Sequence, residues 1–234
     1  MRCTHVAVPP LLVCTIQKSD CTFVRTDAFF PMFIGKPHSV CMRPSLWGPT
    51  MWRMMLACTW NVSDDLVDVV QHFLLVLVPE ILPCTTCAEH YKGHITTVNR
   101  KARGRPSAGD HSFRWCWYMK NEVNMSLTPP VTSVHLADLA ERYLLHGAVV
   151  PHVEAADVLV LCAIQARNES KDDVYVEFCA SMAALLRDDN SVFLHYLKHV
   201  GRPIIPTTLR LARFTREAHG LPRMDLLKYK ETVR

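Results

Sequence analysis

The chain has 234 residues, of which 49% are hydrophobic and 21% are charged, and it contains only 8 glycines. These values are typical of a globular protein, and they exclude a collagen-like or wholly disordered chain. The formal net charge of +4 is too small to make nucleic acid or an anionic membrane the expected partner. We expect no membrane span either, because no segment approaches the roughly 20 consecutive apolar residues that a spanning helix needs.

Residues 1–45 are expected to form an irregular arm that is rich in cysteine. Prolines interrupt this segment repeatedly, and it has no helical periodicity. Four of the chain's ten cysteines lie in it: Cys3, Cys14, Cys21 and Cys41. Ten cysteines are many for a chain of this length but too few for a small disulfide scaffold, so they indicate thiol chemistry or metal binding.

Apolar residues at helical spacing predict four helices within residues 46–130. Ser63 followed by two aspartates is typical of a helix start, and Pro79 is expected to end that helix. Pro83 suits the first position of the next helix, because its missing N–H is not needed there. We expect the four helices over residues 47–60, 66–78, 84–97 and 111–126. Four short helices in one segment predict a small helix bundle.

Residues 131–201 predict a second helical unit, with helices over residues 133–149, 152–168, 172–187 and 191–199. This unit is acidic, because residues 134–200 hold ten Asp or Glu and five Lys or Arg. The tail, residues 202–234, holds eight Lys or Arg and three Asp or Glu. We expect this basic tail to be solvated or to lie on the acidic helices rather than to bind nucleic acid. The predicted fold class is all-α, a four-helix bundle followed by a second helical unit.

The strongest local motif is the CxxC formed by Cys84 and Cys87 at the start of a predicted helix. The unpaired N–H groups and the positive dipole at a helix N-terminus stabilise a thiolate, which favours a redox-active cysteine pair. One alternative is a zinc site made by these cysteines with His90 and His94, although four ligands on a single helix spread around its surface. A second alternative is a pair of inert, buried thiols.

Three motifs follow one another along the predicted bundle. They are Trp-Gly-Pro-Thr-Met-Trp at residues 47–52, Pro-Cys-Thr-Thr-Cys-Ala-Glu-His at 83–90, and Trp-Cys-Trp-Tyr-Met-Lys-Asn-Glu-Val-Asn at 115–124. In this order they resemble the Erv/ALR family of FAD-dependent sulfhydryl oxidases, especially its divergent members in large DNA viruses. The resemblance covers residues 46–130. It implies a homodimeric four-helix bundle that binds FAD, forms disulfides in thiol-containing protein substrates and passes the electrons to O₂, giving H₂O₂.

The resemblance also implies roles for individual residues. Cys84 would be attacked by the incoming thiolate, and Cys87 would lie beside the flavin. The cofactor-contacting positions would be Trp52, His90, Trp115, Lys120, Asn121 and Asn124. The chain departs from the family at Leu56 and Lys120, where a histidine is usual. Lys120 can still reach a pyrophosphate as a point charge, and the alternative is a degenerate copy that no longer binds flavin.

The remaining cysteines have open roles. Oxidases of this family commonly pass electrons through a second cysteine pair on a flexible segment. By this resemblance, the four cysteines of the arm are candidates for that pair. Cys58 and Cys116 lie on separate predicted helices of the bundle, and Cys162 and Cys179 lie on neighbouring helices of the second unit. Each pair is a candidate disulfide, but a sequence alone does not determine the connectivity.

Overall fold

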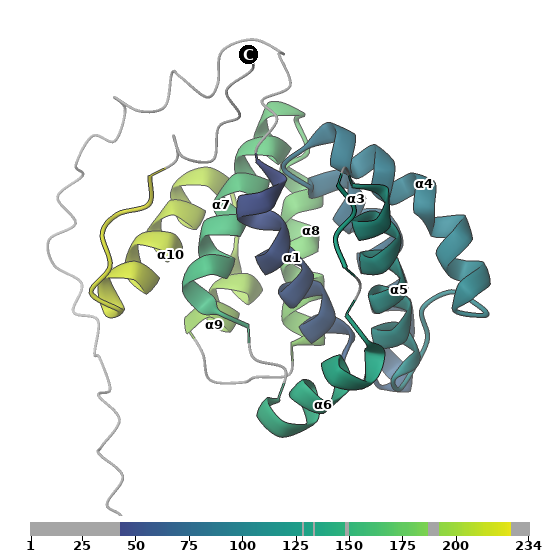
Figure 1. Ribbon diagram of the computed structural model, residues 1–234. Helices are drawn as coiled ribbons and strands as arrows, with labels where there is room; N and C mark the ends of the chain where they lie inside the picture. The colour runs from purple at the N-terminus through teal and green to yellow at the C-terminus, as the bar shows by residue number, and fades with distance from the viewer. Residues whose placement is uncertain (1–42, 128, 133, 148–149, 187–191, 226–234) are drawn as a thin grey trace, which may run out of the picture. The chain divides into compact units, whose positions relative to one another are not determined.

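The computed structural model describes residues 43–127, 129–132, 134–147, 150–186 and 192–225 (Figure 1). Their regular structure is helical, and their only β contact is an isolated bridge between Val62 and Gly109. The predicted all-α fold class is therefore confirmed for these residues. All of them belong to one compact unit that spans Lys36–Arg234. The cysteines predicted to serve the arm, Cys3, Cys14, Cys21 and Cys41, lie outside the described residues.

Three of the helices predicted in the first segment form close to their expected bounds. Helix α1 spans Pro44–Thr59 and begins with a proline at its first turn, where no N–H is needed. Helix α4 spans Thr85–Lys101, so Cys84 caps it and Pro83 lies just before it. Helix α5 spans His111–Ser126, as the sequence predicts.

The predicted helix at 66–78 is longer and more varied than expected. It begins with a single 3-10 turn at Asp64–Leu66 and continues through α2 (Val67–His72), a π-helical turn at Phe73–Leu77 and α3 (Val78–Ile81). The prediction that Pro79 ends this helix was wrong. In the π turn the Val78 N–H bonds to the Phe73 carbonyl, five residues back, and Pro79 then occupies the first turn of α3, where a missing N–H is tolerated.

The second half of the chain is also helical. Its helices are α6 (Leu136–His146), α7 (His152–Asn168), α8 (Asp172–Leu185), α9 (Val192–His199) and α10 (Ile204–Ala218). Helix α7 has its predicted bounds, whereas α10 lies in the segment predicted only as a basic tail. Ile204, Leu211 and Ala212 of α10 are buried, and α10 packs on α7. The expectation that the tail lies on acidic helices is therefore met for this helix.

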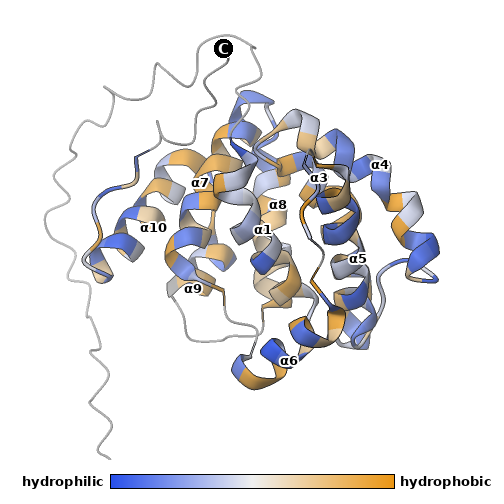
Figure 2. Cartoon of the chain, viewed as in Figure 1, coloured by the Kyte–Doolittle hydropathy of each residue, from blue (hydrophilic) through white to orange (hydrophobic). Residues whose placement is uncertain are grey.

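The centre of the described structure is α7, in which every residue from Ala155 to Ala166 is buried. Helix α7 contacts α1, α3, α8 and α10, and Figure 1 shows α1 between α5 and α7. The rings of Phe73 and Phe178 stack with centroids 5.2 Å apart. These contacts cross the predicted boundary between residues 130 and 131, so both halves share one core, and hydrophobic residues run through α7 and α8 (Figure 2).

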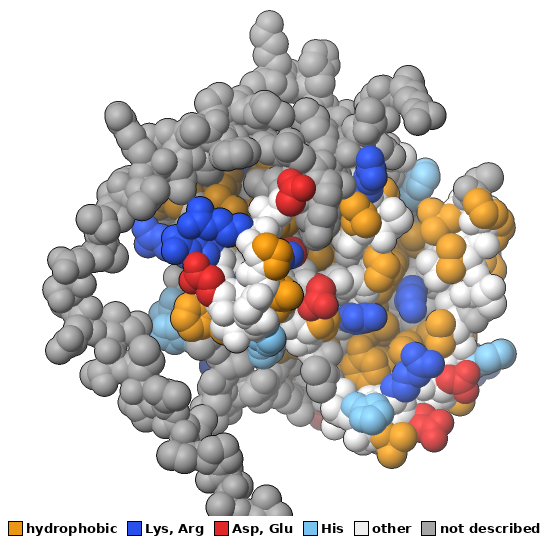
Figure 3. All heavy atoms as spheres, turned by 60° about the vertical axis from the view of Figure 1, so that its left-hand side comes forward, with side chains coloured by type: hydrophobic (Ala, Val, Ile, Leu, Met, Phe, Trp, Pro, Cys, Tyr) orange, Lys and Arg blue, Asp and Glu red, His pale blue; other side chains and the backbone are white. Residues whose placement is uncertain are grey.

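The surface is mixed in character. On the face seen in Figure 3, hydrophobic side chains are interspersed with Lys and Arg side chains. None of the helices within the described ranges combines the length and the apolar character that crossing a membrane requires.

Candidate functional site

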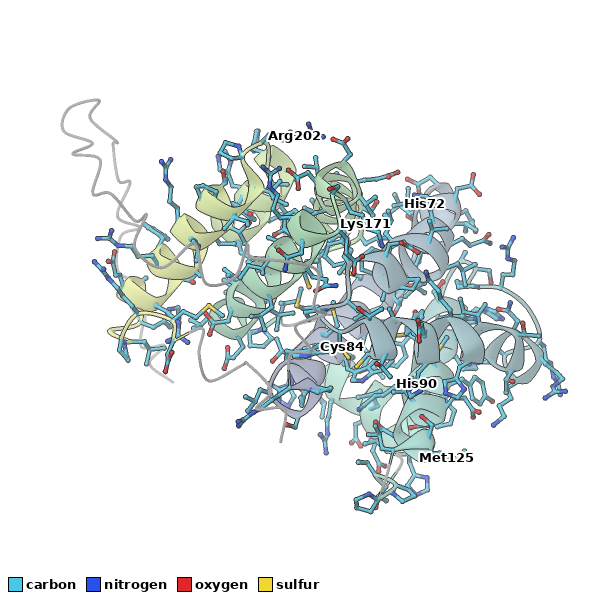
Figure 4. The ribbon with its side chains drawn as sticks, turned by 90° about the horizontal axis from the view of Figure 1, so that it is seen from above. His72, Cys84, His90, Met125, Lys171 and Arg202 are labelled. Carbon is cyan, nitrogen blue, oxygen red and sulfur yellow. The ribbon has the colours of Figure 1, made fainter. Side chains whose placement is uncertain are left out.

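The CxxC pair lies at the N-terminus of α4, as expected. Cys84 is the N-cap residue, and its Sγ accepts a hydrogen bond from the backbone N–H of Cys87 at 3.3 Å. Cys84 is only 2% exposed, whereas Cys87 is partly exposed. In Figure 4 Cys84 lies among the helices. This order of exposure is opposite to the one implied by the resemblance, in which an incoming thiolate attacks Cys84.

A short connection between two helices places this pair. Leu82 and Cys84 have extended backbones, so α3 ends at Ile81 and α4 begins at Thr85 without a longer loop. Ion pairs hold this corner, because the Glu80 carboxylate of α3 accepts hydrogen bonds from Lys92 of α4 and from Lys171, the latter at 2.7 Å. These hydrogen bonds hold the pKa of Glu80 below its usual value.

An aromatic pair connects α1 to α4, the helix that begins at the CxxC. The rings of Trp52 and Tyr91 stack with centroids 6.4 Å apart and an angle of 26° between their planes. Trp52 is partly exposed, and Tyr91 is 2% exposed. Burial raises the pKa of Tyr91, and its buried hydroxyl makes no hydrogen bond within the described structure. The site therefore contains an aromatic face and an unused donor.

Two of the residues predicted to contact a cofactor, Lys120 and Asn121, are neighbours on α5. Asn121 is 7% exposed, and its buried Oδ1 has no hydrogen-bond partner. Lys120 is half-buried, and its pKa is lowered mainly by burial, while Cys116 raises it and the nearby charges of Arg142 and Arg53 lower it further. A buried acceptor without a donor and a half-buried cation beside like charges are both unfavourable unless another group satisfies them.

The other residues predicted to contact a cofactor have different surroundings. Trp115 is fully buried, and its indole N–H donates to Oδ1 of Asn99 at 2.8 Å, so its visible role is packing α5 against α4. His90 is exposed on α4 (Figure 4). Asn124 is partly exposed, and its backbone carbonyl accepts the N–H of Val131 at 3.1 Å. Their contacts with a cofactor stay predictions.

Tyr91 and Tyr143 are not among the residues that the sequence predicts for the site. Tyr91 directly follows His90, and an aromatic residue one turn beyond a CxxC is the signal that could have identified it. Tyr143 of α6 packs against Phe113 of α5, with ring centroids 5.0 Å apart. No comparable signal identifies Tyr143, because α6 follows the segment that carries the three motifs.

The four remaining described cysteines are buried free thiols: Cys58, Cys116, Cys162 and Cys179. Neither candidate disulfide pair is bridged in the structure. The members of each pair are close enough that Cys116 raises the pKa of Cys58 and Cys179 raises that of Cys162, in addition to the larger effect of burial. Burial raises the pKa of Cys116 and that of Cys179 to about 12, which makes both thiols unreactive at neutral pH.

The arrangement of side chains does not support the zinc alternative. Among the described residues, which include Cys84, Cys87, His90 and His94, no three His, Cys, Asp or Glu side chains are grouped so that they could hold a metal ion. Cys84 caps α4 while His90 is exposed on its surface.

Comparison of the chain with protein-family models, with curated proteins and with solved structures finds no match.

Proposed function

We propose that this protein is an FAD-dependent sulfhydryl oxidase that forms disulfides in thiol-containing proteins and reduces O₂ to H₂O₂. The observation that carries the proposal is the CxxC pair at the N-terminus of α4, where the Cys84 sulfur caps the helix and accepts the Cys87 N–H. The order of the three sequence motifs supports it. An Erv/ALR-type bundle formed by residues 46–130 and a homodimer are parts of the same proposal.

The position of Cys84 suits the sulfur that leaves during disulfide exchange. A substrate thiolate attacks the more accessible sulfur, Cys87, and the Cys84–Cys87 bond breaks with its electron pair passing to Cys84. The Cys87 N–H and the helix N-terminus stabilise the resulting Cys84 thiolate. A second substrate thiolate then attacks the mixed disulfide, which releases the oxidised substrate and leaves Cys87 as a thiolate. Two electrons thus pass from the substrate to the cysteine pair.

The residues near α4 and α5 fit a flavin nucleotide. Trp52 supplies a partly exposed aromatic ring. The Tyr91 hydroxyl and Asn121 Oδ1 are a buried donor and a buried acceptor without partners, which a ligand would reach only by displacing the side chains around them. Each unsatisfied buried polar group costs about 1–3 kcal/mol, and a ligand with complementary polar edges would remove this cost. Lys120 would place a positive charge beside an anionic group of that ligand. Bound FAD would accept two electrons from the cysteine pair and transfer them to O₂.

Purified full-length protein tests this proposal. We expect a flavin absorbance spectrum, retained or obtained after adding FAD, and O₂ consumption with dithiothreitol. Cys84→Ser and Cys87→Ser should abolish turnover and retain flavin, because the sulfurs exchange electrons while the surrounding helices hold the cofactor. Cys179→Ala is the matched control, since it removes a buried thiol of α8 and should keep activity. A protein that does not bind FAD, or turnover that survives loss of either CxxC sulfur, would contradict the proposal.

A degenerate, non-catalytic copy of such an oxidase is the second candidate. The full burial of Trp115 favours it, because this side chain exposes no surface to a cofactor. The presence of leucine at position 56, where the resembling family usually has histidine, points the same way. The absorbance measurement separates the two candidates, since a degenerate copy takes up no flavin.

A further inference from the structure

Three cations from three different helices lie close enough that the charges of two of them act on the third. They are Arg53 of α1, Lys120 of α5 and Arg142 of α6. None of the three side chains takes part in an ion pair or a hydrogen bond among the described residues. Other Lys and Arg side chains are paired: Lys92, Lys101, Arg114, Arg167, Lys171, Arg202, Arg213 and Arg216. Arg43, Arg100, Arg103, Arg105, Arg210 and Arg223 form no ion pair among the described residues either. The three cations are distinguished by their closeness to one another, because Arg53 and Arg142 both act on the pKa of Lys120.

Contacts of Tyr143 hold α6, and with it Arg142, against α1 and α5. The Tyr143 ring lies 5.4 Å from that of Trp60 and 5.0 Å from that of Phe113, measured between centroids. Its hydroxyl donates to the backbone carbonyl of Arg53 at 3.4 Å. Because Arg142 directly precedes Tyr143, this packing holds the backbone of Arg142 close to Arg53.

The segment before α6 is also attached to α5. The indole N–H of Trp117 donates to the backbone carbonyl of Val134 at 2.7 Å. Trp117 lies one turn before Lys120 on α5, and Val134 lies just before α6. The hydrogen bond between them therefore keeps the start of α6 close to Lys120. The three cations are thus brought together by packed aromatic rings and backbone hydrogen bonds rather than by flexible loops.

This arrangement is unfavourable without a bound anion. Lys120 is partly removed from water, and this burial lowers its pKa most. Cys116 opposes the shift, and repulsion by Arg142 and Arg53 adds to it. No carboxylate contributes to the electrostatics of this lysine. Like charges held together at a partly desolvated position favour binding of a multivalent anion. Arginine binds phosphate oxygens in a bidentate manner, and lysine binds them as a point charge.

We propose that Arg53, Lys120 and Arg142 form a binding site for a diphosphate group. A diphosphate has several negative oxygens on two centres, so it can contact cations from three helices at once, which a single carboxylate cannot. The group can belong to a dinucleotide or to free diphosphate. The assignment to the diphosphate of FAD rests on the proposed function, whereas the site itself does not. Arg142 lies outside the segment that resembles the oxidases, so α6 completes the site.

Calorimetric titration of the dialysed full-length protein tests this inference. The ligands are inorganic pyrophosphate, FAD and riboflavin, which lacks phosphate. Arg53→Gln, Lys120→Gln and Arg142→Gln should each weaken binding of the diphosphate-bearing ligand by about tenfold, the usual effect of removing one charged hydrogen bond. Arg210→Gln is the matched control, because Arg210 is an exposed arginine of α10. It should leave every affinity unchanged, and thermal unfolding should show that all variants are folded.

The ligands distinguish the two sources of the diphosphate. Weaker FAD binding in the Arg142 variant with unchanged riboflavin binding would identify the diphosphate of FAD. Binding of pyrophosphate that depends on the three cations, in a protein that takes up no FAD, would support the site and contradict the proposed function. The inference is wrong if neither ligand binds, or if the three substitutions weaken binding no more than Arg210→Gln does.

Discussion

The guanidinium of Arg216 forms a bidentate ion pair with the carboxylate of Asp157, with Nε 3.0 Å from Oδ1 and Nη2 bonded to Oδ2. The two side chains are 12% and 4% exposed, so α10 is fastened to the central helix α7 by a buried pair of charges. Breaking such a pair is costly, because it leaves one charge buried without its partner.

We therefore expect Asp157→Ala to lower the free energy of unfolding by about 3–5 kcal/mol. Urea denaturation followed by circular dichroism measures this difference. Arg213→Ala is the control, because Arg213 pairs with Glu217 on the exposed side of the same helix, and such pairs contribute about 0–1 kcal/mol. Equal effects of the two substitutions would show that α10 does not depend on the buried pair.

The exposure of the CxxC sulfurs predicts which of them accepts the substrate thiolate. In Cys84→Ser the remaining Cys87, and in Cys87→Ser the remaining Cys84, can be converted to a mixed disulfide with thionitrobenzoate. We expect dithiothreitol to release thionitrobenzoate faster from Cys87, because Cys84 is buried. Absorbance at the thionitrobenzoate band gives both rates. Faster release from Cys84 would show that Cys84 accepts the substrate thiolate, as the family resemblance implies.

Alkylation should separate the CxxC pair from the buried thiols. In the reduced native protein at about pH 8, iodoacetamide is expected to modify Cys87 and to spare Cys58, Cys116, Cys162 and Cys179, since all four are buried and have raised pKa values. Peptide mass spectrometry with and without urea makes the comparison. Rapid native labelling of any of the four would show that its helix opens readily.

The raised thiol pKa values predict a loss of stability in alkaline solution. Cys116 has a pKa of about 12 in the folded protein, against about 8.5 when unfolded. Between these values the unfolded state has lost the proton and the folded state has kept it, so the free energy of unfolding falls as the pH rises. Each such thiol contributes a slope of up to about 1.4 kcal/mol per pH unit.

Cys116→Ala should make that slope shallower between about pH 8.5 and pH 11. A cavity left by the substitution lowers stability at every pH, so comparing slopes rather than absolute values isolates the thiol. Urea denaturation at several pH values provides the data. An unchanged slope would mean that Cys116 is not protected from ionisation in the folded protein.

The two tryptophans predicted to contact a cofactor should respond differently to substitution. Trp115→Phe removes the donor to Asn99 and should lower the free energy of unfolding by about 1–2 kcal/mol with little effect on FAD affinity. Trp52→Phe changes a partly exposed ring and should weaken FAD binding with little effect on stability. Flavin fluorescence and urea denaturation together test both. The opposite pattern would indicate that Trp115, rather than Trp52, contacts the cofactor.

Several elements of the fold could be predicted because their signals are local. Helix α7 has a proline just before its first residue, and α5 lies between a Gly-Asp pair and a proline-rich stretch. Such signals determine where a backbone can start or stop hydrogen bonding, so they act through neighbouring residues alone. The same holds for the CxxC, whose place at a helix start follows from Pro83 and the residues after it.

Other features depend on residues that are distant in the sequence. Helix α10 was missed because its basic residues dominate the composition of the tail, while its anchor, Asp157, lies 59 residues from Arg216. Its apolar spacing, with Ile204, Leu211 and Ala212 buried, was a usable signal. The sequence could not predict the relative exposure of Cys84 and Cys87 or the burial of Trp115 either, because the helices that pack around a side chain determine its burial.

The sequence by itself determined the all-α class, most helix bounds and the cysteine pair at the start of a helix, because backbone hydrogen bonding, capping and helical spacing are properties of neighbouring residues. Only the tertiary structure decided that both halves share one core around α7 and that the charges of Arg53 and Arg142 act on Lys120. The reason is physical, since desolvation and Coulomb interactions depend on distances in space, which helix packing sets and spacing along the chain does not.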